Sequence, residues 1–269
     1  MSSPDCRITV AGLEAVAARG WRGTETEALG GWLLRAAGGF TGRANSALPL
    51  GDPGLPVGPA IGRVEEWYAA RGLSPRFLLP LPDAQAVDDE LAARGWPLGD
   101  VVRVLVAPVA GLAAGGAADR AAGRPAVRLD DRPDDAWVAA YHYRGGVLPP
   151  HARQVIEHGD TLAFASVRDA AGRVLAIARG SVDDDIDADA DADADGVGWL
   201  GVTAVEVEPA SRRQGLGGVI LRGLAGWAQE RDARCCYLQV AADNAPALAL
   251  YAGAGFAEHH TYQYRLAPG

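Results

Sequence analysis

Arg-Arg-Gln-Gly-Leu-Gly-Gly, residues 212–218, stands between a strand-like run at residues 202–207 and an amphipathic run at residues 219–231. Glycine tolerates turn conformations that a side chain forbids, and it lets backbone N–H groups come close to a ligand. The following helix adds free N-terminal N–H groups and the positive end of its dipole, which favour an anion. The segment therefore predicts a pyrophosphate-binding turn between a strand and a helix.

Two other kinds of phosphate-binding loop do not fit this segment. A Walker-type loop needs a Lys-Ser/Thr pair after the glycines, and a nicotinamide-binding loop needs the spacing G-x-G-x-x-G; neither is present. The pattern Arg/Gln-x-x-Gly-x-Gly, from Arg212 to Gly217, resembles the acetyl-CoA signature of the GNAT N-acetyltransferases. Residues 244–256 are similar to that family's segment N-x-x-A-x-x-L-Y-x-x-x-G-F, and residues 238–240 look like the strand between them. The alternative is a structural loop followed by an ordinary core helix.

The resemblance implies acetyl-CoA as cosubstrate and names the residues that hold it. The strand edge at Val205 and Val207 would splay from its neighbour and bind pantetheine and the thioester carbonyl, while amides of residues 213–218 would bind pyrophosphate. Asn244 would bind the pantetheine arm or cap the helix that begins before Pro246. The predicted cofactor-binding set is Val205, Val207, Arg212, Arg213, Gln214, Gly215, Leu216, Gly217, Gly218, Asn244 and Tyr251. No metal is expected.

Acetyl transfer to an amine needs a positioned thioester, a deprotonated nucleophile and stabilisation of the oxyanion. The resemblance makes Tyr251 the candidate general acid for the departing thiolate; the alternative is a core tyrosine beneath the cofactor. Relatives that acetylate protein N-termini can carry glutamate where this chain has Gln239, and glutamine cannot accept a proton at neutral pH. Glu206 alternates with the valines on either side, so it faces the other side of the strand and is the candidate catalytic base. A solvated glutamate with a water chain as the base is the alternative.

The acceptor pocket is expected to draw on Tyr141 and Tyr143, at the end of a predicted helix, and on a polar hairpin at residues 31–46. This hairpin resembles a segment of actinobacterial tandem GNAT proteins, some of which are described as N-acetylglutamate-synthase-like. Its Arg43 could bind a substrate carboxylate or satisfy a domain interface. The expected activity is direct acetyl transfer, in a ternary complex, to the amine of an amino acid or antibiotic-like small molecule. Protein or peptide N-acetylation and non-catalytic acyl-CoA sensing are the alternatives.

A weak internal repeat organises the chain. A shift of 160 residues aligns residues 49–108 with residues 209–268 without a gap, and it matches Trp67 with Trp227 and Gly95 with Gly255. Each half then shows helix, strand, helix and strand: 61–71, 76–81, 84–94 and 101–106, then 219–231, 235–240, 245–254 and 261–266. Further strands are expected at 126–130, 161–168 and 173–182, and helices at 134–144 and 149–158. The fold class is therefore α/β with an α+β mixed sheet, in two tandem GNAT-like domains.

The same shift predicts which half binds the cofactor. Arg212, Gly215 and Gly217 fall opposite Asp52, Leu55 and Val57, whose side chains would repel phosphate or block the backbone. We therefore expect a degenerate domain without a cradle at residues 1–109, a linker at 110–125 and an acetyl-CoA-binding domain at 126–269. The first half would be a structural partner or a wall of the acceptor pocket.

Composition bears on nucleic-acid binding, membrane contact and the use of the cysteines. The net charge of −9 falls to −1 without the eight aspartates between residues 183 and 195, so no basic face for nucleic acid is indicated. With no apolar run of about 18 residues and no secretory signal pattern, no membrane contact and a cytoplasmic location are expected. Cys6, Cys235 and Cys236 indicate neither a disulfide nor a zinc site and are interpreted as core residues. A homodimer is compatible with the sequence, which does not decide the oligomeric state.

Overall fold

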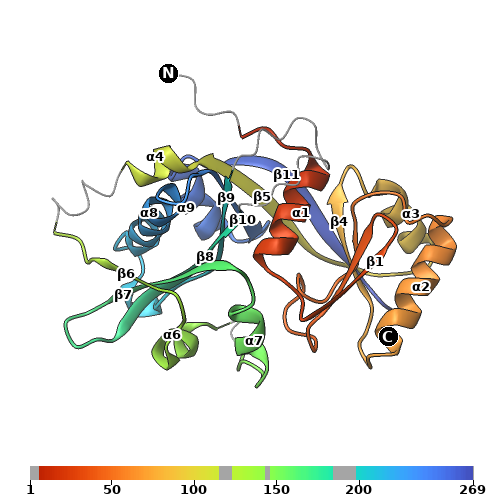
Figure 1. Cartoon of the computed structure of the whole chain (residues 1–269), viewed down its shortest axis with the longest axis horizontal. Helices are drawn as coiled ribbons and strands as arrows, with labels where there is room; N and C mark the ends of the chain where they lie inside the picture. The colour runs from red at the N-terminus through yellow and green to blue at the C-terminus, as the bar shows by residue number, and fades with distance from the viewer. Residues whose placement is uncertain (1–5, 115–122, 143–145, 184–197, 269) are drawn as a thin grey trace.

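The computed structural model describes residues 6–114, 123–142, 146–183 and 198–268. Eight strands form one sheet in the order β4-β11-β5-β10-β9-β8-β7-β6, and three form a small sheet in the order β1-β2-β3. Helices α2 and α3 lie at one end of the molecule, while α6 and α8 lie toward the other (Figure 1). This architecture confirms the predicted mixed α/β class.

The described elements follow the chain in this order. Those of the first half are α1 (Val10–Gly20), β1 (Glu25–Leu29), β2 (Trp32–Ala36), β3 (Leu48–Pro49), α2 (Val57–Ala69), β4 (Arg76–Leu81), α3 (Gln85–Ala93), β5 (Leu98–Pro108) and α4 (Val109–Ala113). Those of the second half are β6 (Val127–Asp130), α6 (Asp135–Ala140), α7 (Ala152–Ile156), β7 (Thr161–Arg168), β8 (Val174–Asp183), β9 (Gly198–Val207), the 3-10 turn η2 (Pro209–Ser211), α8 (Leu216–Gln229), β10 (Ala233–Ala241), α9 (Ala245–Gly253) and β11 (Ala257–Leu266).

Most predicted elements are present, and their differences have local causes. α8 begins three residues before the predicted start, because Gly215 takes a φ of 77° and ends the preceding turn there. α6 is shorter than predicted: it ends at Ala140, and Tyr141 turns to extended backbone. α1 has no counterpart among the predicted elements; it is capped by Thr9, whose hydroxyl accepts from Gly12 N at 3.0 Å.

The 160-residue repeat is visible as equivalent contacts. The Arg71 guanidinium lies 3.6 Å from the ring centroid of Trp67 and donates to the Trp67 carbonyl at 2.9 Å. The matching Arg231 lies 4.6 Å from the Trp227 ring and also donates to that residue's carbonyl at 2.9 Å. Both halves thus repeat one side-chain arrangement at the end of the same helix.

The two halves exchange their closing strands. β5, from the first half, lies between β10 and β11, while β11 pairs with β4 and β5. The 160-residue shift relates β4 to β10 and β5 to β11. If each strand is replaced by its equivalent, the order β4-β11-β5-β10 becomes the same order read in the opposite direction. Strand alternation predicts that a strand exists but not which partner it takes. The predicted division at residues 110–125 therefore separates segments that share one sheet, and the two-domain description stays a prediction.

The two faces of the large sheet are covered differently. On one face, Val202 and Leu238 pack beneath α8 together with α4 and α9. The opposite face meets α1, α6 and α7, and Trp21, Phe40 and Ile177 lie in its core. The strands thus separate a layer under α8 from a layer that joins both halves of the chain.

One prediction about the cysteines is wrong. Cys6 and Cys235 form a disulfide with their Cα atoms 5.8 Å apart, although 229 residues separate them in sequence. Spacing along the chain cannot reveal so distant a pairing, because folding alone brings the two segments together. Cys236 faces the opposite side, as strand alternation predicts, and is buried beneath α8.

No described helix is long and apolar enough to cross a membrane. Tyr143 and most of the acidic run, residues 184–197, lie outside the described residues.

Candidate active site

β9 and β10 separate at their C-terminal ends. Their parallel pairing runs from Ala233↔Gly198 to Leu238↔Val202, although β9 continues to Val207 and β10 to Ala241. In β9, Ala204 has a φ of 52° and the pairing with β8 shifts register between Thr203 and Glu206. Such a bulge bends one strand away from its neighbour. The predicted splay at Val205 to Val207 is confirmed.

The glycine-rich turn leads directly into α8. Arg213 and Gly215 both take left-handed conformations, with φ of 65° and 77°. Consecutive N–H groups can converge on an anion in such a turn, and the first N–H groups of α8 lie beside it. The predicted position of the turn between β9 and α8 is confirmed.

Side chains lie close to the position that a Cβ would take at each of the three glycines of this turn. A Cβ at Gly215 would fall on Nη1 of Arg124, and one at Gly218 would lie 3.0 Å from Nη1 of Arg222. A Cβ at Gly217 would lie 2.8 Å from Cδ2 of Leu250. Gly217 therefore lets α9 pack on α8, while the other two glycines admit arginines to the start of α8.

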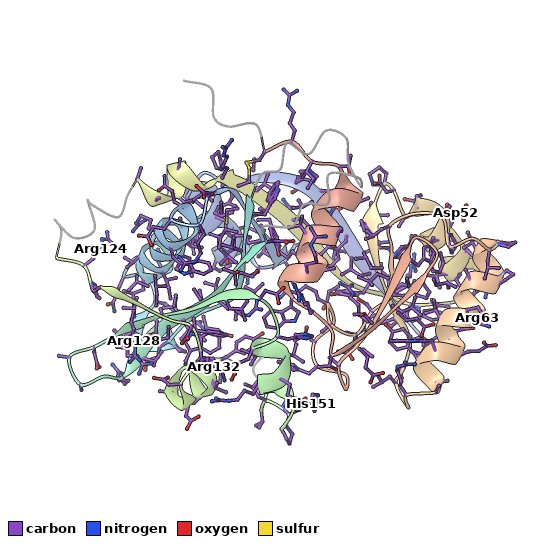
Figure 2. All side chains as sticks on the ribbon, viewed as in Figure 1. Asp52, Arg63, Arg124, Arg128, Arg132 and His151 are labelled. Atoms are coloured by element: carbon purple, nitrogen blue, oxygen red, sulfur yellow. A yellow bond between two sulfur atoms is a disulfide. The ribbon has the colours of Figure 1, made fainter. Side chains whose placement is uncertain are left out.

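Arg124 and Arg222 are absent from the predicted cofactor set. Arg124 precedes β6 (Figure 2) and donates from Nη1 to the Gln214 carbonyl at 3.5 Å. It belongs to the stretch interpreted as a linker, so no local pattern marks it. Arg222 lies in the second turn of α8, and helical spacing is the only sequence pattern that includes it. Both bring positive charge to the place where the motif predicts pyrophosphate.

A cavity of about 500 Å³ adjoins the turn on the α6 side of the sheet. It lies between the end of α6, the start of β8 and the end of β9, and Arg212 lines it. The Arg212 side chain donates from Nε to the Val207 carbonyl at 3.2 Å. The lining residues are Ala140, His142, Val174, Leu175, Ala176, Ile177, Glu206, Val207, Glu208, Pro209 and Arg212.

Glu206 lines this cavity, and strand alternation places it on the side of β9 opposite Val205, which packs toward α8. Burial raises the pKa of its carboxyl group, and this effect is opposed by His142, whose backbone N–H donates to it, and by Arg212. A carboxylate with a raised pKa is a better proton acceptor near neutral pH. The position therefore suits a base.

Tyr251 and Asn244 lie on α9. The Tyr251 ring is 7% exposed and meets the Phe256 ring at 5.8 Å between centroids. Burial, with a smaller contribution from Cys236, raises the pKa of Tyr251 to about 12, so its hydroxyl keeps a proton at neutral pH. Asn244 caps α9 by accepting from Ala247 N at 3.2 Å, the structural role foreseen for it.

The residues predicted to bind the acceptor are not in one place. Tyr141 is buried, with its ring 6.1 Å from that of Trp137, and its neighbour His142 lines the cavity instead. Arg43 donates from Nη1 to Oε1 of Gln239 at 2.8 Å. This contact joins the first half of the chain to β10 at the splay, as the interface interpretation of Arg43 expects.

In the first half, the loop before α2 corresponds to the glycine-rich turn before α8, and it is packed against another turn. Gly31 N donates to the Asp52 carbonyl at 2.6 Å, and a Cβ at Gly31 would lie 2.8 Å from Gly51. The β1–β2 turn thus packs on the loop before α2, and Pro56, which has no N–H, precedes that helix. This packing agrees with a missing cradle in the first half.

Within the described ranges, no three His, Cys, Asp or Glu side chains are grouped as metal ligands would be.

Known proteins resemble nearly the whole chain. Residues 9–265 match the family model described as "Probable histone acetyltransferase Rv0428c C-terminal". The chain is 33% identical over 268 residues to the probable histone acetyltransferase Rv0428c of Mycobacterium tuberculosis, which covers 97% of this chain and 75% of that protein. It is 25% identical over 258 residues to the uncharacterized N-acetyltransferase YobR of Bacillus subtilis, and the match covers 94% of this chain and 97% of that protein.

Solved structures agree on the fold. A GCN5-related N-acetyltransferase from Kribbella flavida has a TM-score of 0.66 at 18% identity, covering 97% of this chain and 96% of the other. A tandem GNAT protein from the clavulanic acid biosynthesis pathway has a TM-score of 0.51 at 17% identity, covering 88% and 78%. The chain belongs to the Rv0428c C-terminal family and is a GNAT-superfamily N-acetyltransferase.

Proposed function

We propose that the chain transfers the acetyl group of acetyl-CoA to the amine of a small molecule, by direct attack in a ternary complex. One observation carries this proposal: Arg212 belongs both to the acetyl-CoA signature and to the lining of the cavity that contains Glu206. A cofactor on the turn would therefore lie beside a half-buried carboxylate.

The described residues fit acetyl-CoA. The edge of β9 from Val205 to Val207 is not paired with β10, so its backbone groups can bond the amides of a pantetheine arm. The turn before α8 offers N–H groups to the pyrophosphate, and Arg124 and Arg222 add positive charge there. When bound, the cofactor supplies the acetyl thioester.

Glu206 takes the proton from the acceptor's ammonium group in this proposal. Its carboxylate accepts from the His142 N–H at the cavity, where burial raises its pKa. The neutral amine then attacks the thioester carbonyl at the splay, and the C–S bond breaks as the new C–N bond forms. Tyr251, which stays protonated, gives its proton to the departing sulfur, and the second proton of the attacking nitrogen replaces the one that Tyr251 loses.

The size and lining of the cavity favour a small acceptor. A volume of about 500 Å³ with Val174, Leu175 and Ile177 in its walls suits an amine with an apolar part. Protein N-acetylation is the second candidate, favoured by the histone acetyltransferase name of the Mycobacterium tuberculosis relative.

A screen for thiol release separates these candidates. Small amines, including amino acids, and histone-derived peptides are offered with acetyl-CoA to the wild type and to Glu206→Gln, and acetyl-CoA binding is measured by calorimetry. Release with small amines alone, lost in Glu206→Gln, supports the proposal. Release with peptides alone supports protein acetylation. Tight binding without release for any amine contradicts both candidates and points to a sensor.

A further inference from the structure

A buried polar chain reaches the splay from the N-terminal helix. Glu14 of α1 is 1% exposed and accepts from Nε2 of Gln239 at 3.5 Å, while Nε2 of His260 lies 3.0 Å from the same oxygen, Oε1. Oε1 of Gln239 accepts from Arg43 at 2.8 Å. Burying a carboxylate without hydrogen-bond partners costs free energy, and these hydrogen bonds offset that cost for Glu14.

This polar chain of side chains ends where β9 and β10 separate. Gln239 directly follows Leu238, the last residue of β10 that pairs with β9. Arg43 lies beside Gln239 with its guanidinium 5.2 Å from the centroid of the Trp21 ring. The polar chain thus connects α1 to the place where the acetyl group would be presented.

Two histidines extend the buried part of this polar chain. Nδ1 of His259 lies 2.8 Å from Nδ1 of His260, and Nε2 of His259 lies 2.9 Å from the Ile8 carbonyl. That carbonyl can only accept, so Nε2 of His259 carries a hydrogen. The two imidazoles thus link the Ile8 carbonyl to Glu14 through the interior of the protein.

Glu14 has a structural task at Gln239. The Gln239 amide accepts from Arg43 and donates to Glu14, so only one of its two flipped orientations satisfies both partners. Arg35 and Tyr262 are further groups that interact electrostatically with Glu14. The orientation of Gln239, and with it the position of the Arg43 guanidinium, depends on Glu14.

We propose that Glu14 is a positioning residue for acceptor binding. It holds Gln239 in one orientation, and Gln239 holds Arg43 at the splay, where the planar guanidinium suits a carboxylate on the acceptor. The substrate class is therefore an amine that also carries a carboxylate. This inference rests on the proposed acetyl transfer to a small amine.

The test compares an amine that carries a carboxylate with the same amine lacking it. Glu14→Leu should raise the KM of the first about tenfold, the loss of one charge-assisted contact, and leave the second within about twofold. kcat and acetyl-CoA affinity should not change. Glu14→Gln keeps an acceptor oxygen toward Gln239, so its KM should stay within about threefold of the wild type.

Further variants keep the test decisive if Glu14→Leu fails to fold. Gln239→Leu leaves the contact between Glu14 and His260 in place and should raise the same KM; the double variant should be no worse than either single one. Asp88→Asn is the matched control, because Asp88 is also buried and binds Gln263 at 2.7 Å, away from the splay. Its KM values should equal those of the wild type.

Three results would overturn the positioning role. They are folded Glu14→Leu and Gln239→Leu proteins with unchanged KM values, a wild type that does not distinguish the two amines, and a large loss of kcat in both Glu14→Leu and Glu14→Gln. The last would make Glu14 a proton acceptor. A wild type that binds no acetyl-CoA, or releases no thiol with any amine, rejects the proposed function instead.

Discussion

The guanidinium of Arg124 occupies the space that a side chain at Gly215 would need, at the first turn of α8. An arginine that precedes β6 thereby contributes to a turn formed 90 residues later in the sequence. Gly215 serves two purposes: its φ of 77° ends the turn, and its missing Cβ admits the arginine.

Arg124→Ala should weaken acetyl-CoA binding about tenfold, because one cation at the phosphates is lost from a partly solvated site. Calorimetry at two salt concentrations checks this, and the variant should show the smaller salt dependence. Arg63→Ala is the control: Arg63 lies on α2 (Figure 2), and its side chain is 64% exposed. Equal loss in both variants would show that the effect is not local to the turn.

Gly217→Trp should abolish acetyl-CoA binding through α9. The new side chain would meet Leu250, which is 2.8 Å from the position of a Cβ, and force α9 with Tyr251 away from α8. Overpacking of this kind costs about 1–3 kcal/mol. Leu55→Trp changes a residue that is 42% exposed in the first half and should leave affinity and melting temperature unchanged. Loss of binding in both variants would contradict a single cradle.

The features that the sequence predicts are those that neighbouring residues determine. The turn at 212–218 and the capping role of Asn244 follow from local patterns of glycine and helix starts, whereas the splay at Val205 to Val207 is expected from the resemblance to the GNAT family. The disulfide, the contact between Arg124 and Gly215, and the exchange of β5 and β11 depend on segments that only the fold brings together. Glu14 has no local signal either, because a glutamate inside an alanine-rich helix is usually solvated.

Reduction of the disulfide should lower the melting temperature. The bond between Cys6 and Cys235 closes a loop of 229 residues, and loss of a native disulfide typically costs about 2–5 kcal/mol. Thermal melts with and without a reductant measure the difference. In Cys6→Ser the reductant should have no further effect, whereas a continued response would place the sensitive bond elsewhere.

Tyr251→Phe should lower kcat about a hundredfold, the lower end of what general acid catalysis contributes, and leave acetyl-CoA affinity unchanged. The ring packing against Phe256 is retained, so the protein should melt near the wild-type temperature. Single-turnover thiol release measures kcat, and calorimetry measures affinity. An unchanged kcat would make Tyr251 a packing residue beneath the cofactor.

The pH dependence of kcat/KM should report Glu206. A base acts when deprotonated, so activity should fall as the pH drops through the pKa of its carboxyl group, and burial raises that pKa above the ordinary value for glutamate. The acidic limb should therefore lie at a higher pH than an exposed glutamate would give. Glu206→Gln should lose most of the activity together with this limb, while Glu208→Gln, whose carboxylate is paired with Arg173 at 2.8 Å, should keep both. An acidic limb that persists in Glu206→Gln would assign the base to another group.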